Sequence, residues 1–181
     1  MQRLIYALIA AASLVASPAM AQNLDITITN LTHGTYFTPL LISAHPAGNH
    51  LFQPGVAATS NLQAMAEGGD ISGLSADMAA LGADNVENPA AGLLAPGSST
   101  TFPVMTSSGN DRLSITAMLL PTNDGFVGLD ALKIPTAIGT YRYTLNGYDA
   151  GTEANDEIVN GGGTPGVPGI PEGSQGRGEP V

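Results

Sequence analysis

The chain lacks cysteine and tryptophan, and Lys133 is its single lysine. Without cysteine it forms neither disulfides nor thiolate metal sites, so any metal must bind through oxygen or histidine. Lysine and arginine together number 5 against 15 acidic residues, which gives a net charge of −10. Because nucleic-acid binding needs clustered cations to neutralise phosphates, this deficit argues against a nucleic-acid partner.

Aromatic residues are also scarce, at 5%, whereas apolar residues make up 43% of the 181 positions. A chain of this length suits one domain, whose core must rest on Leu, Ile, Val, Ala and Met. A strongly acidic surface is typical of exported proteins and of proteins that meet divalent cations.

The N-terminus carries an export pattern. Arg3 precedes an apolar run from Leu4 to Ala16, and Ala19-Met20-Ala21 follows as a small-x-small cleavage signal. This arrangement predicts a signal peptide over residues 1–21, cleaved between Ala21 and Gln22. The run is too short to span a bilayer, so we expect a secreted or periplasmic protein with no transmembrane segment in the mature chain.

Alternating apolar and polar residues predict several short strands. The loop between Asp84 and Pro96 contains turn signals, and Pro103 marks its strand as an edge strand. Because no strand–helix–strand alternation is present, the pattern favours an all-β fold, an antiparallel β-sandwich. The expected strands are Asp25–Thr29, Leu40–Ala44, Thr100–Met105, Leu113–Leu120 and Thr140–Leu145, and Phe126–Leu129 is an apolar segment between the last two.

Two segments change to a helical period. A capping box at Ser60 and Gln63 predicts a helix that ends at Gly68-Gly69, and Asp70 is the expected cap of a second helix ending at Gly82. We interpret these as a short helical insertion covering an end or edge of the sheet, with Met65 and Met78 on a core-facing stripe. A partner-binding groove is the alternative interpretation of that stripe.

The composition changes again at residue 160, where glycine and proline dominate up to Val181. Such a segment buries too little apolar surface to offset its ordering entropy. The sequence therefore predicts a signal peptide (1–21), a β-sandwich domain (22–159) and a disordered tail (160–181).

Two glycine-bearing loops carry carboxylates at the ends of predicted strands. Asp124 lies in the first loop, and Asp149 and Glu153 flank Gly151 in the second. Calcium takes six to eight oxygen ligands, and strand ends meet at the poles of a sandwich, so these three carboxylates are candidate Ca²⁺ ligands. Asn123 and Thr152 are possible further oxygen donors. The alternative is that all are solvated turn-forming residues.

These same residues resemble a known family. The run from Leu113 to Leu129 resembles the strand and loop of the spondin domain, and Tyr148-Asp-Ala-Gly-Thr-Glu153 is similar to that family's Tyr-Asp-Ala-Gly-Thr-Asp signature. The resemblance spans roughly residues 23 to 158. It implies a β-sandwich shaped like calcium-dependent lipid-binding domains, with one calcium ion held by Asp124, Asp149 and Glu153. Glu153 replaces the usual Asp, and Gly125 stands where animal members have Trp.

The resemblance favours a secreted, non-enzymatic calcium-binding module for adhesion or for extracellular or periplasmic binding. The animal members' disulfide-rich repeats are absent from this sequence, so matrix adhesion does not carry over directly. A calcium-dependent binder of lipid headgroups or glycans is the alternative, and a hydrolase using Asp124 with Asp149 is a third. Histidines 33, 45 and 50 lie in predicted loops without a carboxylate cluster, which favours surface histidines over a transition-metal site.

Overall fold

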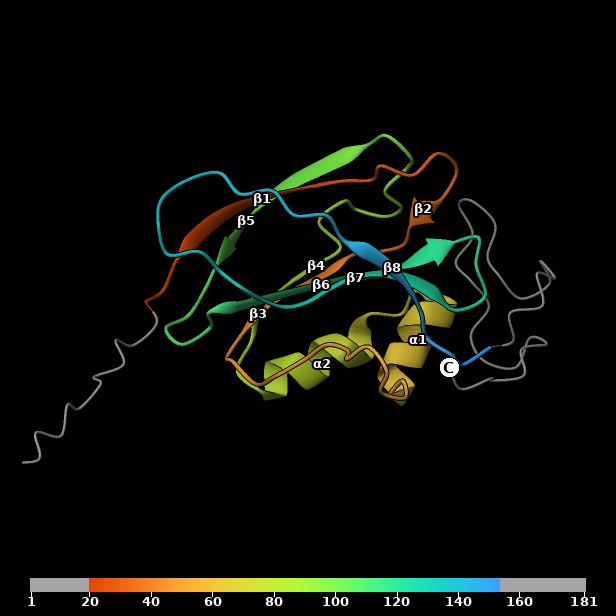
Figure 1. The fold of residues 1–181 in the computed structure, drawn as a ribbon, viewed down its shortest axis with the longest axis horizontal. Helices are drawn as coiled ribbons and strands as arrows, with labels where there is room; N and C mark the ends of the chain where they lie inside the picture. Colours follow the sequence, from red (N-terminus) through yellow and green to blue (C-terminus); the bar gives the residue numbers. More distant parts are fainter. Residues whose placement is uncertain (1–19, 154–181) are drawn as a thin grey trace, which may run out of the picture.

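The computed structural model describes residues 20–153. The predicted tail and all but the last two residues of the predicted signal peptide lie outside this range. Within it, strands predominate and two short helices form one insertion (Figure 1). The elements are β1 (Asn23–Thr29), β2 (Tyr36–Phe37), β3 (Leu41–His45), α1 (Ser60–Gly68), α2 (Ser72–Ala80), β4 (Asp84–Glu87), β5 (Ser99–Met105), β6 (Arg112–Leu120), β7 (Gly125–Lys133) and β8 (Asn146–Asp149).

Two antiparallel sheets form the sandwich. The small sheet pairs β1 with β5, and the large sheet has the order β4-β3-β6-β7-β8, with β2 joined to β6. All of these pairings are antiparallel. The predicted fold class, an antiparallel β-sandwich with a short helical insertion, is therefore confirmed.

The small sheet shows why an alternating sequence produces a sandwich. On β1, Ile28 is buried while Thr27 and Thr29 face outward. These two threonines meet hydroxyl partners on β5, at 2.8 Å between the Oγ1 atoms of Thr27 and Thr101 and 2.7 Å between Thr29 Oγ1 and Ser99 Oγ. One face of the strand thus contributes to the core and the other to exposed cross-strand pairs.

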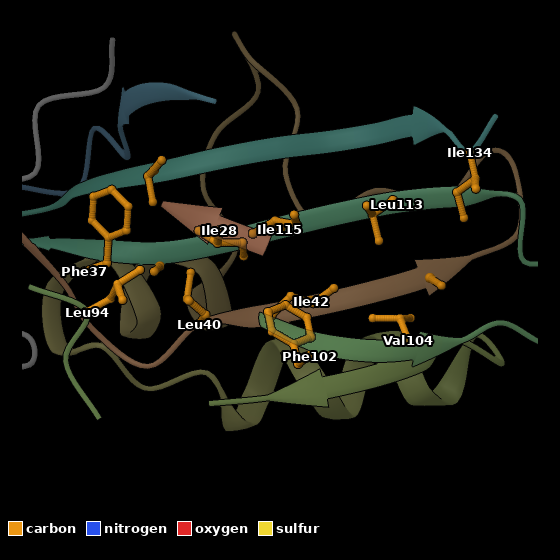
Figure 2. Packing of buried hydrophobic residues seen from close by; sticks show 13 residues of the cluster. Ile28, Phe37, Leu40, Ile42, Leu94, Phe102, Val104, Leu113, Ile115 and Ile134 are labelled. Carbon is orange, nitrogen blue, oxygen red and sulfur yellow. The ribbon is translucent and has the colours of Figure 1, made fainter. Parts of the chain in front are cut away.

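The first core lies between the two sheets. Figure 2 shows Ile28, Phe102 and Val104 of the small sheet beside residues of the large sheet such as Ile42 and Ile115. Pro103 lies on β5, which has β1 as its single partner strand among the described residues, so the predicted edge position is confirmed.

The second core lies on the other face of the large sheet, which both helices cover (Figure 1). Met65 of α1 and Met78 of α2 are fully or almost fully buried there, against Leu41 and Met118 of the sheet. The helical methionine stripe is therefore core packing, as expected. The insertion covers a face of the sheet rather than its edge, because its apolar residues need an apolar surface of matching size.

Several local predictions were wrong. Asp84–Glu87 was expected to be loop but forms β4. It does so by antiparallel pairing with the buried residues Leu41 to Ala44 of β3. Within residues 20–153, Thr140–Leu145 has no strand partner, and the last strand of this range is β8 at residues 146–149, inside the expected acidic loop. The cap of α1 is Thr59 rather than Ser60, since the Leu62 N–H donates to Thr59 Oγ1 at 3.1 Å.

Candidate metal centre

Pairing of β7 with β8 brings the two acidic loops together. Gly125 at the start of β7 lies opposite Asp149 at the end of β8. Beyond this pair, the Ala150 N–H donates to the Asp124 carbonyl oxygen at 3.2 Å. The loop before β7 and the segment after β8 therefore lie side by side at one pole of the sandwich, as the sequence predicted.

Asp124 fastens the second segment to the first. Its Oδ2 atom accepts hydrogen bonds from the backbone N–H groups of Thr152 and Glu153, at 2.8 and 3.0 Å, and from the Thr152 hydroxyl at 3.3 Å. The Asp124 side chain is only 3% exposed. Hydrogen bonds to a buried carboxylate are among the stronger ones in proteins, so this residue organises the loop pair.

Two local turns shape the site. Asp149 Oδ1 accepts from the Gly151 N–H at 2.7 Å, and Gly151 has a φ of +68°, which glycine adopts without strain. In the first loop, Thr122 Oγ1 accepts from the Gly125 N–H at 3.0 Å. A Cβ atom at Gly125 would lie 2.7 Å from that Oγ1 atom, so a larger residue there requires Thr122 to move.

The three candidate ligands differ in their exposure to solvent. Asp124 and Glu153 are each 3% exposed and lie on the two adjoining segments, whereas the side chain of Asp149 is exposed. Within residues 20–153 no group of three or more His, Cys, Asp or Glu side chains is arranged to hold a metal ion. The pair Asp124 and Glu153 supplies hard oxygen donors of the kind that Ca²⁺ prefers. A calcium site built on this pair must complete its shell with backbone carbonyls, water or a rotated Asp149.

A small pocket adjoins this pole. It has a volume of about 50 Å³ and lies between the loop after β3, helix α1 and strand β8. Its walls include Phe52, Tyr148 and Asp149, and Val56 lies at an exposed position in the lining. Phe52 and Tyr148 pack edge to face with ring centroids 4.8 Å apart. A small pocket with mixed polar and apolar walls therefore lies directly beside one of the candidate ligands.

A second polar cluster, which the sequence did not indicate, lies on β3, β6 and β7. His45 Nε2 lies 2.8 Å from Ser114 Oγ, and Ser114 Oγ lies 3.3 Å from Asp130 Oδ1. Asp130 also binds His50 Nδ1 at 2.5 Å and the Leu51 N–H at 2.9 Å. Asp130 thereby fastens the loop after β3 to strand β7.

The expectation that the three histidines lie on the surface is wrong for His45, which is fully buried. Burial lowers the pKa of His45, although the neighbouring Asp130 and the Pro46 carbonyl act in the opposite direction. The neutral ring donates from Nδ1 to the Pro46 carbonyl at 3.0 Å and accepts from the Ser114 hydroxyl at Nε2. Ser114 is also fully buried, so no substrate reaches it in this conformation and the cluster stabilises the fold.

The fold and the loop pair define a class: a β-sandwich module with an acidic pole. The family model for Spondin_N matches residues 29–158, well over half of the chain, and the chain therefore belongs to the spondin N-terminal domain family. Spondin N-terminal domains are non-catalytic modules and occur in extracellular proteins. No curated protein matches the chain significantly.

Proposed function

We propose that the protein is an exported, non-enzymatic spondin-type module in which one calcium ion bridges the loop before β7 and the segment after β8. The observation that supports this most directly is the burial of two carboxylates, Asp124 and Glu153, on these adjoining segments. Two buried negative charges repel each other and lose hydration, and a divalent cation between them offsets both effects.

The donor set accounts for the choice of calcium. Asp124 and Glu153 provide carboxylate oxygens, and Asp149 adds a third carboxylate if its side chain turns from the Gly151 N–H. Hard oxygen ligands select Ca²⁺ or Mg²⁺ over softer transition metals, and a shell completed by carbonyls and water suits the larger, more flexible Ca²⁺. Bound calcium supplies positive charge and rigidity at this pole.

Export follows from the leader pattern of residues 1–21 and from the acidic composition of the remaining chain. None of the helices within residues 20–153 has the length and apolar character needed to cross a membrane. A calcium-stabilised, acidic module of this kind suits adhesion to, or binding of, an extracellular protein, a glycan or a lipid surface. Nucleic acid is a poor partner because only four basic residues remain after the leader is removed.

The pocket beside Asp149 favours a second candidate function, a calcium-dependent binder of lipid headgroups or glycans. In that case the ion keeps an open coordination position toward the ligand, and the hollow lined by Tyr148 and Val56 accepts an apolar part of it. The two functions differ in one observation. Binding to liposomes or to a glycan array appears with calcium and disappears with chelator for the second function alone.

The calcium proposal is tested with Asp149→Asn, which keeps a side-chain oxygen for the Gly151 N–H but removes a charge. We expect a smaller calcium-induced rise in melting temperature and an unchanged melting temperature in chelator. Asp25→Asn, on the exposed face of β1, is the matched control and should leave both values unchanged. An equal loss of stability for Asp149→Asn with and without calcium would contradict a role for this residue in metal binding.

A further inference from the structure

The connection between β7 and β8 forms a long loop that is exposed along most of its length (Figure 1). Residues 136–144 are all exposed. Within residues 20–153, the backbone of residues 135–145 makes no hydrogen bond to other backbone groups. The loop does bond to itself through the Tyr141 hydroxyl, which donates to the Ala137 carbonyl oxygen at 3.0 Å. Proteases cut folded proteins at such segments, because they bind a main chain that is accessible and unpaired.

Arg142 lies in this loop and is one of the four basic residues that follow the predicted leader. Proteases of the trypsin class cut after arginine or lysine, which an acidic specificity pocket binds. The scarcity of basic residues therefore limits where such a protease can act on this chain. The other three basic residues are Arg112, Lys133 and Arg177, of which Arg177 lies outside the described residues.

The bonds after Arg112 and Lys133 are protected by the large sheet. Leu113, which follows Arg112 in β6, is buried and pairs with both neighbouring strands. Lys133 is exposed but ends β7 opposite Arg112, and the next residue, Ile134, is buried and donates its N–H to the Asp111 carbonyl oxygen at 2.9 Å. Cleavage at either bond requires the sheet to open, whereas cleavage in the exposed loop does not.

We propose that the peptide bond between Arg142 and Tyr143 is a processing site for a protease of the trypsin class. The protease hydrolyses this bond with water as the co-reactant. The hydroxyl of water adds to the carbonyl carbon of Arg142 and the proton goes to the nitrogen of Tyr143, so a carboxyl group and an amine replace the peptide bond. The exposed Arg142 side chain enters the specificity pocket without any change in the packing of the domain.

This cleavage leaves β8 without a covalent link to the strands before it. Four residue pairs still join β8 to β7, and the Tyr148 ring stacks on Phe126 with centroids 5.4 Å apart. Asp124 still accepts hydrogen bonds from the N–H groups of Thr152 and Glu153. A strand of this length is short, and the two fragments no longer benefit from the high effective concentration that one chain provides. The smaller fragment is therefore held weakly by these contacts alone.

The cut also divides the proposed calcium site between the two fragments, and this part of the inference rests on the proposed function. Asp124 stays with the larger fragment, whereas Asp149 and Glu153 belong to the smaller one. An ion that bridges these carboxylates then becomes a contact between fragments. Cleavage therefore makes the attachment of β8 and its acidic segment dependent on calcium.

The processing site is tested by brief digestion of the purified protein with trypsin, followed by mass spectrometry of the fragments. We expect a fragment that begins at Tyr143 to form at least about tenfold faster than fragments cut after Lys133 or Arg112. Cleavage after Arg177 removes only residues 178–181 and does not affect this comparison.

Two variants separate an unpaired backbone from mere exposure of an arginine. Arg142→Gln should remove the fast cleavage and leave the melting temperature unchanged, because this side chain is exposed. Thr27→Arg, made in the Arg142→Gln background, places an arginine at an exposed position of β1. It should not restore fast cleavage, because the backbone of β1 is paired with β5. Fast cleavage after residue 27 would show that exposure alone selects the bond, and would overturn the argument for the loop.

Gel filtration of the cleaved protein tests the role of calcium. We expect the two fragments to elute together in millimolar calcium and separately in excess chelator. Cleavage that begins after Lys133 or Arg112, or that is no faster after Arg142, would overturn the processing site. Fast cleavage after Arg142 followed by identical elution in calcium and in chelator would support the processing site and overturn the calcium bridge between the fragments.

Discussion

Asp124 offers the sharpest test of how the acidic pole is organised. Replacing it with alanine removes the Oδ2 atom that accepts from the Thr152 N–H, the Glu153 N–H and the Thr152 hydroxyl. Glu153 is buried and Thr152 is partly buried, so water does not readily replace the lost acceptor. Asp124→Asn keeps an oxygen that can accept from the same donors while removing the charge.

The expected magnitude follows from these contacts. A hydrogen bond to a charged group contributes about 1.5–3 kcal/mol, and leaving a buried donor unsatisfied costs about 1–3 kcal/mol. For two backbone donors we expect Asp124→Ala to lower the free energy of unfolding by about 3 kcal/mol in the presence of chelator. For a domain of this size that corresponds to a fall in melting temperature of roughly 6–12 °C.

The assay is thermal unfolding in chelator, followed by circular dichroism, so that metal binding does not contribute. Asp124→Asn should retain most of the stability, and the exposed Asp25→Ala should change the free energy of unfolding by about 0.5 kcal/mol or less. If Asp124→Ala unfolds within about 1 kcal/mol of the unmodified protein, the hydrogen bonds described here do not hold the loop pair together.

Three further predictions concern the remainder of the fold. The pKa of His45 is lowered in the folded state, so the unfolded chain binds a proton at His45 more readily than the folded protein does. The contribution of His45 to stability is therefore complete above about pH 6.5 and decreases as the pH falls toward the lower folded-state pKa. Urea titrations across pH 5–8 should show a smaller decrease in stability at low pH for His45→Gln. Met118→Ala should destabilise by about 2–5 kcal/mol because Met118 is fully buried, whereas Met105→Ala, at an exposed position, should be nearly neutral in the same titration. Gly128→Ala should destabilise by about 1–3 kcal/mol because its Cβ would lie 2.5 Å from the Phe52 ring, whereas Gly147→Ala meets its nearest atom at 3.7 Å and should cost less in a thermal melt.

Opposite results would contradict each of these in turn. If the stability of His45→Gln depends on pH as strongly as that of the unmodified protein, groups other than His45 cause this dependence. Equal stabilities for the Met118 and Met105 variants would contradict the second core, and equal stabilities for the two glycine variants would contradict the position of the loop that carries Phe52.

Much of the fold is predictable because its core strands have a strong pattern. Asp25–Thr29 and Leu113–Leu120 alternate clearly, and both are strands. The strand Asp84–Glu87 has no such pattern, since it forms through pairing with β3 rather than through its own residues. Thr140–Leu145 shows the converse, because its alternation is clear but residues 20–153 supply no partner strand.

The candidate site was only partly predictable. The spacing of Asp149 and Glu153 around Gly151 indicated two carboxylates near one point, but the turn that Asp149 makes with the Gly151 N–H leaves Asp149 exposed and Glu153 buried. Nothing in the sequence indicated that His45 meets Ser114, because the two are 69 residues apart and join only through the pairing of β3 with β6.

The pairing of the acidic loops also explains why a short signature identifies the site region. Residues 148–153 are contiguous, and their contact with Asp124 follows from a hairpin-like pairing of β7 and β8. Local sequence therefore specifies the turn between Asp149 and Gly151, whereas the contact with Asp124 depends on the pairing of β7 with β8. The side-chain directions depend on packing against the large sheet, which no local pattern contains.

The central claim, that calcium bridges the two loops, is tested most directly by melting the purified protein with millimolar calcium and with excess chelator. At a calcium concentration of 100 times the dissociation constant, binding stabilises the folded state by about 2.7 kcal/mol. The account predicts a rise of roughly 5–10 °C that magnesium does not reproduce and that Asp124→Asn reduces. An identical melting temperature in calcium and in chelator would contradict the claim, and the buried pair Asp124 and Glu153 would then be a structural feature of the loops alone.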